Sequence, residues 1–594
     1  MNKFKFSSKR VIFITLIVMA IGIAFVSMYF GAAKYIMPMF MSYFSNPWIP
    51  ILNTLPVIMI ILCIYSLSNR VWLSFLLTSC ITILISWVNY FKIELRNDPL
   101  LAGDLVFINE SKNMLFQYKI YPNYKMAITV VAIAIITIMS IFLFRKGILS
   151  QKERIILFFS IVICSIVMGN YLYSNDKLYQ SIENYSLANR WNATEDYISR
   201  GVVYPFLASI KTSINQAPKG YSKQEVIKIL DVYEGGEIAD DKKVNIISIM
   251  LEGYSDFSHQ KQLDFSENPY EFYHQLEKES YTGNLINNVF AGGTVSTERG
   301  FLTGYTSLPN FRRQVDTYVW YLRDQGYYTE GSHPYYNWFY NRMNVNPYLG
   351  FENYYYLENY YSGKKDTHYM RDELLFEEIL GFYEKGKKMD RPYFSFSVTM
   401  QNHGPYGKTY EGIPYIINKG YCEESSAIMN NYLQGIDQTT KSLEKMVNTL
   451  KNDTEPVVLI IFGDHRPWLG DANSVYHELG INIDLSTEEG FYNYYGTRYL
   501  IWANASAKES LDNDFLGEGP DIGSYFLMNE FFILAGYEGP KFMKYSNTIK
   551  EEFSVIHSQD AWVKDDGFVR ELDKNEQETL RKFNHVQYYL KTKN

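Results

Sequence analysis

Cysteine is scarce in this chain, which has four among 594 residues. Cys63, Cys80 and Cys164 fall within apolar runs, so Cys422 is the single cysteine of the polar remainder. A disulfide within that remainder is therefore excluded, and its stability must come from a packed core or a bound metal. No activating pattern surrounds Cys422, which we interpret as an inert thiol.

An excess of positive charge is also missing. The chain has 56 Lys and Arg against 64 Asp and Glu, a formal net charge of −8. This balance gives no reason to expect a nucleic-acid partner. We find no internal repeat and no low-complexity tract, so the length predicts two or three ordinary units.

Long apolar runs, by contrast, fill the N-terminal part. Five of them, each near the roughly 20 residues that a helix needs to cross a bilayer, cover 11–30, 49–67, 71–90, 126–144 and 155–173. A cleaved signal peptide can explain the first run but not the other four. The sequence therefore predicts a multi-span α-helical membrane domain over residues 1–173.

The distribution of Lys and Arg predicts the orientation of these spans. Basic residues gather in the N-terminal tail, after the second run and after the fourth: Lys3, Lys5, Lys9, Arg10, Arg70, Arg145, Lys146, Lys152 and Arg154. The opposite loops hold Lys34 in 31–48 and a mixture of both signs in 91–125. By the positive-inside rule the tail is inside. Five crossings then put everything after residue 174 outside, as expected for a multi-pass plasma-membrane protein with an extracellular C-terminal part.

The C-terminal part has the pattern of an α/β domain. "VNIISIMLEG" (244–253) and "PVVLIIFGDH" (456–465) are short, continuous apolar runs, typical of parallel strands buried on both faces. "PYFSFSVTMQNHG" (392–404) is a further strand, and helically spaced apolar residues between 429 and 450 complete a βαβ unit. We predict a helical connecting arm over 174–243 and a domain with a largely parallel sheet over 244–594. The charged last 40 or so residues are expected to be peripheral.

Polar residues follow several of these strands. Glu252 ends one, Asp464 and His465 end another, and His403 ends a third. The segment "FAGGTVSTERGFLTG" (290–304) follows the strand-like "LINNVF" (285–290), which places Thr294 at the same rim. Ligands of open parallel sheets bind beyond the carboxyl ends of the strands. We therefore expect these side chains to face one another.

Two carboxylates and one imidazole suit a divalent ion such as Mn²⁺ or Zn²⁺. A hydroxyl bound to that ion has a lowered pKa and becomes a usable nucleophile. Arg342 in "YNRM", His333 in "GSHP" and His403 are candidates for binding phosphate oxygens. Simpler readings stay open: a Thr after Gly-Gly is more often a turn or helix-cap residue, and a strand-end acid is often a surface group. The other histidines are interpreted as structural or surface residues: His259, His274, His368, His477, His557 and His585.

The order of these motifs resembles the lipoteichoic acid synthase family. Behind five apolar spans come Glu252, "GGTVSTE", "HPYYNWFYNR", "VTMQNHGPY" and "FGDH", and "RNDPLLAGDL" (96–105) is similar to a family segment outside the third span. Members of this family are membrane-anchored glycerophosphate transferases with a sulfatase/alkaline phosphatase-like outer domain. The resemblance implies the same fold and origin from a Gram-positive-type bacterium.

The resemblance also implies a site. The metal-bound threonine nucleophile falls on Thr294, and the metal ligands fall on Glu252, Asp464 and His465. The substrate contacts fall on Arg342, His403 and, less securely, His333. The cofactor is one divalent ion, Mn²⁺ first, with Mg²⁺ or Zn²⁺ as alternatives. Thr294 would take glycerophosphate from phosphatidylglycerol and pass it to an acceptor hydroxyl.

The sequence departs from the chain-polymerising synthases at two places. They typically have Lys where this chain has Gly293, and an aromatic-Gly pair where it has "RPWLG" after His465. The acceptor therefore stays open between a growing polyglycerolphosphate chain on a glycolipid and a cell-wall polysaccharide.

Four alternative functions share parts of this pattern. A phosphoethanolamine transferase also uses a metal-bound threonine nucleophile and is the second choice. A sulfatase needs a Cys or Ser in a C/S-x-P-x-R frame, and the near miss "SLPNF" has Phe311 in place of the Arg. A phosphatase of this fold commonly uses two metals and more ligands. A catalytically silent scaffold predicts a broken ligand set, whereas all four ligand positions are intact.

Overall fold

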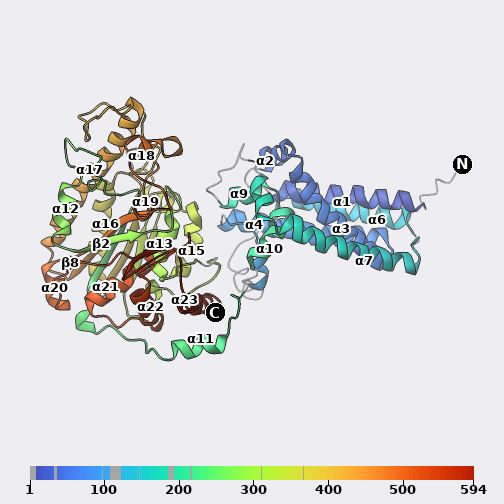
Figure 1. Cartoon of the computed structure of the whole chain (residues 1–594). Helices are drawn as coiled ribbons and strands as arrows, with labels where there is room; N and C mark the ends of the chain where they lie inside the picture. Colours follow the sequence, from blue (N-terminus) through green and yellow to red (C-terminus); the bar gives the residue numbers. More distant parts are fainter. Residues whose placement is uncertain are drawn as a thin grey trace. The chain divides into compact units, whose positions relative to one another are not determined.

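The computed structural model describes residues 8–31, 36–96, 98–107, 122–145, 147–182, 184, 193–213, 217–308, 311–364 and 367–593 (Figure 1). Contacts divide the chain into two units, Met1–Gln216 with Trp338–Asn344 and Ala217–Asn337 with Val345–Asn594. Four of the lysines on which the predicted orientation depends lie outside the described residues: Lys3, Lys5, Lys34 and Lys146.

The first unit contains the five predicted spans. Among the described residues, five helices are long and apolar enough to cross a membrane: α1 (Lys9–Gly31), α3 (Trp48–Ser68), α4 (Val71–Arg96), α6 (Tyr124–Leu143) and α7 (Gln151–Met168, continued by a π-helical turn to Tyr173). The most apolar stretches of α6 and α7 are only 17% and 6% buried within the protein. Such exposed apolar faces suit contact with lipid.

Shorter helices complete this unit: α2 (Ile36–Ser42), α8 (Asp176–Ser181), α9 (Ala193–Ser199) and α10 (Val203–Ser213). Asn53 of α3 anchors the turn between α9 and α10. Its amide donates to the Arg200 carbonyl at 2.8 Å, and its oxygen accepts from Val202 and Tyr204 N–H. Within 174–243, residues up to 216 thus group with the first unit and 217–243 with the second.

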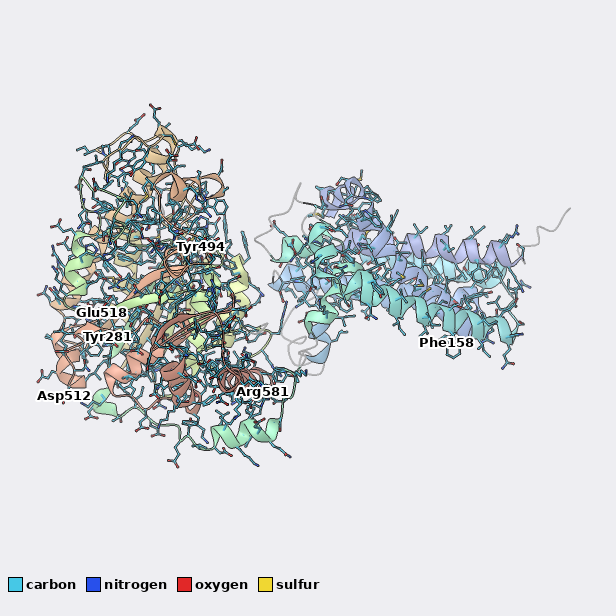
Figure 2. The ribbon with its side chains drawn as sticks, viewed as in Figure 1. Phe158, Tyr281, Tyr494, Asp512, Glu518 and Arg581 are labelled. Atoms are coloured by element: carbon cyan, nitrogen blue, oxygen red, sulfur yellow. The ribbon has the colours of Figure 1, made fainter. Side chains whose placement is uncertain are left out.

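The second unit is built on an eight-stranded sheet with the order β4-β3-β5-β1-β6-β7-β2-β8. Its strands are β1 (Asn245–Leu251), β2 (Tyr281–Ile286), β3 (Tyr328–Ser332), β4 (Asn353–Tyr355), β5 (Tyr393–Val398), β6 (Val457–Gly463), β7 (Gly496–Ala503) and β8 (Gly517–Glu518). The pairs from β4 to β6 are parallel, and β7 is antiparallel to both of its neighbours, β6 and β2. The predicted largely parallel sheet is therefore confirmed. Figure 2 labels Tyr281 and Glu518 on β2 and β8, the pair at one edge of the sheet.

Helices cover both faces of this sheet (Figure 1). In β1, Ile246 and Met250 belong to one core and Ile247, Ile249 and Leu251 to the other, as strands buried on both faces require. One core includes residues of α11 (Lys223–Leu230), α13 (Thr294–Thr303), α14 (Tyr318–Asp324), α15 (Arg342–Leu349), α20 (Ala505–Leu511), α21 (Leu527–Ala535), α22 (Lys541–Glu552) and α23 (Lys574–Thr592). The other includes residues of α12 (Glu271–Glu277), α16 (Asp372–Gly386), α17 (Glu423–Lys451) and α18 (Ser474–Glu478).

The structure corrects two expectations. The strand expected at 285–290 is β2 at Tyr281–Ile286, because its pairing with β7 extends through the polar residues before Leu285. The end of the chain is not peripheral: α23 buries Phe583, Val586 and Leu590 in the core. A second sheet of β9 (Val555–His557), β10 (Ala561–Lys564) and β11 (Gly567–Val569) packs its Val555, Ala561 and Val563 against α19 (Glu488–Tyr495).

Candidate active site

Three potential metal ligands meet where β1 and β6 end. These strands pair in parallel with Leu251 opposite Gly463, so the next residues, Glu252 and Asp464, emerge side by side. His465 Nε2 lies 3.1 Å from Asp464 Oδ2 and 3.7 Å from Glu252 Oε1. One ligand atom from each residue lies within 4.8 Å of the others, and all three residues are buried. The structure therefore brings Glu252, Asp464 and His465 together at the ends of β1 and β6, as the sequence predicts.

Asp464 is held by one oxygen and leaves the other to the site. Its Oδ1 accepts the backbone N–H groups of Gly253 and His465, both at 2.8 Å. Its Oδ2 is buried and accepts no hydrogen bond from any described residue. A buried carboxylate oxygen without a donor is costly unless a cation or a proton lies beside it.

The tautomer of His465 follows from its neighbour. His465 Nδ1 lies 3.0 Å from the carbonyl oxygen of Arg466, which can only accept, so Nδ1 carries the hydrogen. Nε2 therefore directs a lone pair toward Glu252 and Asp464. A carbonyl on the far ring nitrogen is the usual support of a metal-binding histidine.

The charge state of Glu252 indicates the same need. Burial raises the pKa of Glu252, and the negative charge of Asp464 raises it further. Two carboxylates and one imidazole lone pair thus face a small buried volume, where they repel one another unless positive charge separates them. This donor set fits a divalent cation with mixed oxygen and nitrogen ligands.

Thr294 completes the cluster as the first residue of α13. Its Oγ1 lies 3.4 Å from both Glu252 Oε2 and His465 Nε2. One turn later Thr297 donates to the Asp464 carbonyl at 2.8 Å, which fastens α13 to the end of β6. The start of a helix carries partial positive charge, which favours an anionic group here.

Glycine allows the chain to enter α13 in this way. Ala291, Gly292 and Gly293 have φ of 54°, 143° and 77° in succession. A Cβ on Gly293 would lie 3.0 Å from Val289 Cγ1, in a conformation that L side chains rarely adopt. Gly293, the site of one departure from the synthases, is therefore required by the backbone of this loop.

Aromatic contacts connect the two predicted histidines at the strand ends. His333 follows β3 and donates from Nδ1 to the Val398 carbonyl at 3.3 Å. Ring centroids lie 6.2 Å apart from His333 to Tyr335, 5.9 Å from Tyr335 to Tyr369 and 5.1 Å from Tyr369 to His403. Burial raises the pKa of Tyr369, and the negative charges of Tyr335 and Glu252 raise it further.

Arg342 is placed differently. It lies in Trp338–Asn344, which groups by contacts with the first unit. The residue is 1% exposed, and its guanidinium lies 5.4 Å from the centre of the Tyr340 ring. Its role toward the site stays a prediction.

Two tyrosines that the sequence analysis does not single out support the loop after Glu252. Tyr432 of α17 accepts the Ser255 N–H at 3.0 Å through its hydroxyl, which also lies 3.1 Å from the Gly253 carbonyl. Tyr270 donates to the Ser255 carbonyl at 2.9 Å. These two hydroxyls fix the backbone directly after Glu252. The many tyrosines were visible in the sequence, but no local pattern singles out these two.

The sequence is similar to a known protein family and to characterised proteins. Residues 244–537 match the Sulfatase family. A Rhizobium meliloti (strain 1021) protein whose name assigns it to cyclic beta-1,2-glucan modification is 23% identical over 542 residues, covering 87% of this chain and 81% of that protein. Lipoteichoic acid synthase of Staphylococcus aureus (strain USA300) is 26% identical over 255 residues, covering 40% of this chain and 38% of the synthase.

Two solved structures are also similar to part of this chain. Streptococcus pyogenes phosphoglycerol transferase GacH, in complex with sn-glycerol-1-phosphate, matches with a TM-score of 0.49 and 18% identity over 64% of this chain and 98% of that one. Lipoteichoic acid synthase LtaP of Listeria monocytogenes matches with a TM-score of 0.45 and 16% identity, over 62% and 98%.

Proposed function

Because residues 244–537 match the Sulfatase family and the described residues include five membrane-type helices, we propose that this protein transfers glycerophosphate from phosphatidylglycerol to an acceptor hydroxyl through Thr294. The observation that carries the proposal is the position of Thr294 Oγ1, 3.4 Å from both Glu252 Oε2 and His465 Nε2. A threonine hydroxyl beside buried, lone-pair-bearing metal ligands suits nucleophilic attack on phosphorus.

Glu252, Asp464, His465 and Thr294 are the proposed ligands of one divalent ion, Mn²⁺ first and Mg²⁺ or Zn²⁺ as alternatives. When bound, that ion lowers the pKa of the threonine hydroxyl and neutralises negative charge on the phosphoryl group. Asp464 stays oriented through its two backbone N–H bonds, and His465 keeps its tautomer through the Arg466 carbonyl. The start of α13 adds partial positive charge where the phosphate would lie.

The proposed reaction has two half-steps. Thr294 Oγ forms a bond to phosphorus, the bond from phosphorus to the diacylglycerol oxygen breaks, and the hydroxyl proton ends on the released diacylglycerol. The acceptor oxygen then forms a bond to phosphorus, the bond from phosphorus to Thr294 Oγ breaks, and the acceptor's proton returns to Thr294. His403 is the proposed proton carrier: Nδ1 donates to the Gly404 carbonyl at 2.7 Å, which leaves Nε2 to exchange a proton. His333 and Arg342 are the proposed contacts of the phosphoryl oxygens.

We further propose that the catalytic part, residues 244–594, faces the outside of the plasma membrane of a Gram-positive-type bacterium, joined to the 1–173 membrane part by the 174–243 arm. A glycan hydroxyl is the preferred acceptor. The name of the relative that matches over 81% of its length, a glucan modification protein, supports a glycan over a growing polyglycerolphosphate chain.

The test is the release of diacylglycerol. Purified full-length protein with Mn²⁺ and labelled phosphatidylglycerol should release diacylglycerol and retain labelled glycerophosphate on Thr294, detected by mass spectrometry of the peptide. Thr294→Ala should abolish both, while Thr294→Ser should retain part of each because it keeps the hydroxyl. Thr297→Ser, which keeps the bond to the Asp464 carbonyl, is the matched control.

Release from phosphatidylethanolamine but not phosphatidylglycerol would replace this proposal with the runner-up, a phosphoethanolamine transferase. Thr294→Ala protein that retains wild-type function in envelope assembly would indicate a catalytically silent scaffold instead.

A further inference from the structure

An aromatic crevice lies within the first unit, among its membrane-type helices. It has a volume of about 350 Å³ and is formed by α1, α2 and the first turns of α6. Phe25, Tyr29 and Phe30 of α1 and Phe40 of α2 supply its aromatic lining. The Phe40 ring lies 6.4 Å from Phe25 and 5.9 Å from Tyr29, measured between centroids, so packed rings shape this wall.

One cation stands at this crevice. Among the described residues that line it, Lys125 is the one with a charge, and the others are apolar, aromatic or hydroxyl side chains. Its ammonium lies 5.4 Å from the centre of the Tyr29 ring. Lys125 is the second residue of α6, which begins at Tyr124, so the charge stands at the end of a membrane-type helix, at the depth expected for lipid head groups.

The crevice adjoins a surface that suits hydrocarbon. Ile128 both lines the crevice and is 62% exposed, and further along α6 the exposed apolar residues include Val131 and Ile135. An apolar chain in the bilayer can therefore enter the crevice sideways without crossing a polar barrier. A molecule that fills it best has a hydrocarbon tail for the rings and a negative group for Lys125.

We propose that this crevice is a binding site for an anionic phospholipid, with one acyl chain against the aromatic wall and the phosphate beside Lys125. Charge complementarity selects the lipid. The phosphate of a lipid with net negative charge pairs with the lysine, whereas the trimethylammonium group of phosphatidylcholine competes for its own phosphate. A basic residue near a bilayer surface contributes about 1 kcal/mol to binding of an anionic lipid, about a five-fold change in affinity. The inference concerns binding and stands independently of the transfer reaction.

The chain offers a matched control for the charge. Lys152 is the second residue of α7, as Lys125 is of α6. Lys125 lies at the start of α6, whereas Lys152 follows the end of α6 after a short loop. Lys125→Gln and Lys152→Gln thus make the same charge change at opposite ends of the membrane helices. Ile128→Trp is a third variant, which fills the crevice from an exposed position where a larger side chain needs no repacking.

The experiment is native mass spectrometry of delipidated full-length protein with equal amounts of phosphatidylglycerol and phosphatidylcholine of the same acyl chains. All variants carry Thr294→Ala, so that turnover cannot consume lipid and a failed transferase proposal does not affect the result. The parent should retain one phosphatidylglycerol in preference to phosphatidylcholine. Lys125→Gln should lower that preference about five-fold, Lys152→Gln should leave it unchanged, and Ile128→Trp should reduce retention of both lipids.

An equal loss in Lys125→Gln and Lys152→Gln, or no loss in either, overturns the proposal. So does undiminished retention in Ile128→Trp. A parallel titration with inorganic phosphate separates a lipid site from a phosphate site: displacement of the lipid by phosphate at millimolar concentration would mean that the acyl chain contributes nothing to binding.

Discussion

Replacing Asp464 by asparagine tests the proposed metal site separately from the stability of the fold. In Asp464→Asn the side-chain oxygen can keep both backbone N–H bonds, now made by Oδ1 of Asp464 to Gly253 and His465. The new amide nitrogen takes the place of Oδ2, 3.1 Å from His465 Nε2, where it can donate to the ring lone pair. The change also removes a negative charge beside Glu252. The metal-free variant should therefore melt at or slightly above the temperature of the metal-free parent, although it lacks one of the proposed metal ligands.

The size of the metal effect follows from mass action. An ion at 100 times its dissociation constant stabilises the folded state by about 2.7 kcal/mol. A unit of roughly 370 residues has an unfolding entropy of about 0.8 kcal/mol/K at about 2.1 cal/mol/K per residue. We expect Mn²⁺ to raise the melting temperature of the parent by about 3 °C and that of Asp464→Asn by less than about 0.5 °C.

The assay is differential scanning fluorimetry of full-length protein after chelation, with and without Mn²⁺. Glu330→Gln is the control. Glu330 is also buried, but it accepts hydrogen bonds from Tyr328 and Tyr393 and is not one of the proposed metal ligands. This control should keep the full shift. A metal-dependent shift of parental size in Asp464→Asn, or a metal-free variant that melts several degrees lower, would refute the reasoning.

Three further predictions concern the surroundings of the site. Tyr432→Phe leaves the buried Ser255 N–H without its acceptor and should cost about 1 to 3 kcal/mol in urea denaturation, together with a fall in diacylglycerol release; parental stability would contradict it. The hydrogen bond to Asp256 raises the pKa of His274 above 6.5. This pair therefore stabilises the fold fully below pH 6.5, and its contribution is lost as the pH rises through the raised value. His274→Gln should make the melting temperature depend less on pH between 6.5 and 9. Burial raises the pKa of Asp372 to about 7, so the free energy of unfolding of the parent should fall as the pH rises from about 4 to 7. Asp372→Asn should remove most of that fall, about 3 kcal/mol. Identical pH profiles for parent and variant would contradict this expectation.

The strand-end part of the site could be predicted from the sequence because its signals are local. Runs 244–253 and 456–465 are apolar and continuous, and parallel neighbours bring the residues after them to one edge. Glu252, Asp464 and His465 therefore follow from pattern and topology rule together. Thr294 was expected at this rim although its strand was placed four residues late, because the loop after β2 leads to the same edge.

Other features had no local signal. The pairing of β2 with β7 joins residues 281–286 to 496–501, and only the assembled sheet determines that contact. Tyr432 supports the loop after Glu252 from 177 residues away in sequence. The buried face of α23 does have a local signal, because Phe583, Val586 and Leu590 recur at helical spacing. The expectation of a peripheral segment was based on the charged composition of this helix and not on that spacing.

The order of the four proposed ligands along the chain determines when during synthesis a metal site could form. Glu252 and Thr294 are synthesised long before Asp464 and His465, and β6 must take its place beside β1 before the four side chains share one location. A nascent polypeptide that lacks its last quarter thus has an incomplete set of the proposed ligands. Because the proposed metal site needs β6 paired with β1, we expect partly synthesised chains to show neither metal binding nor transfer.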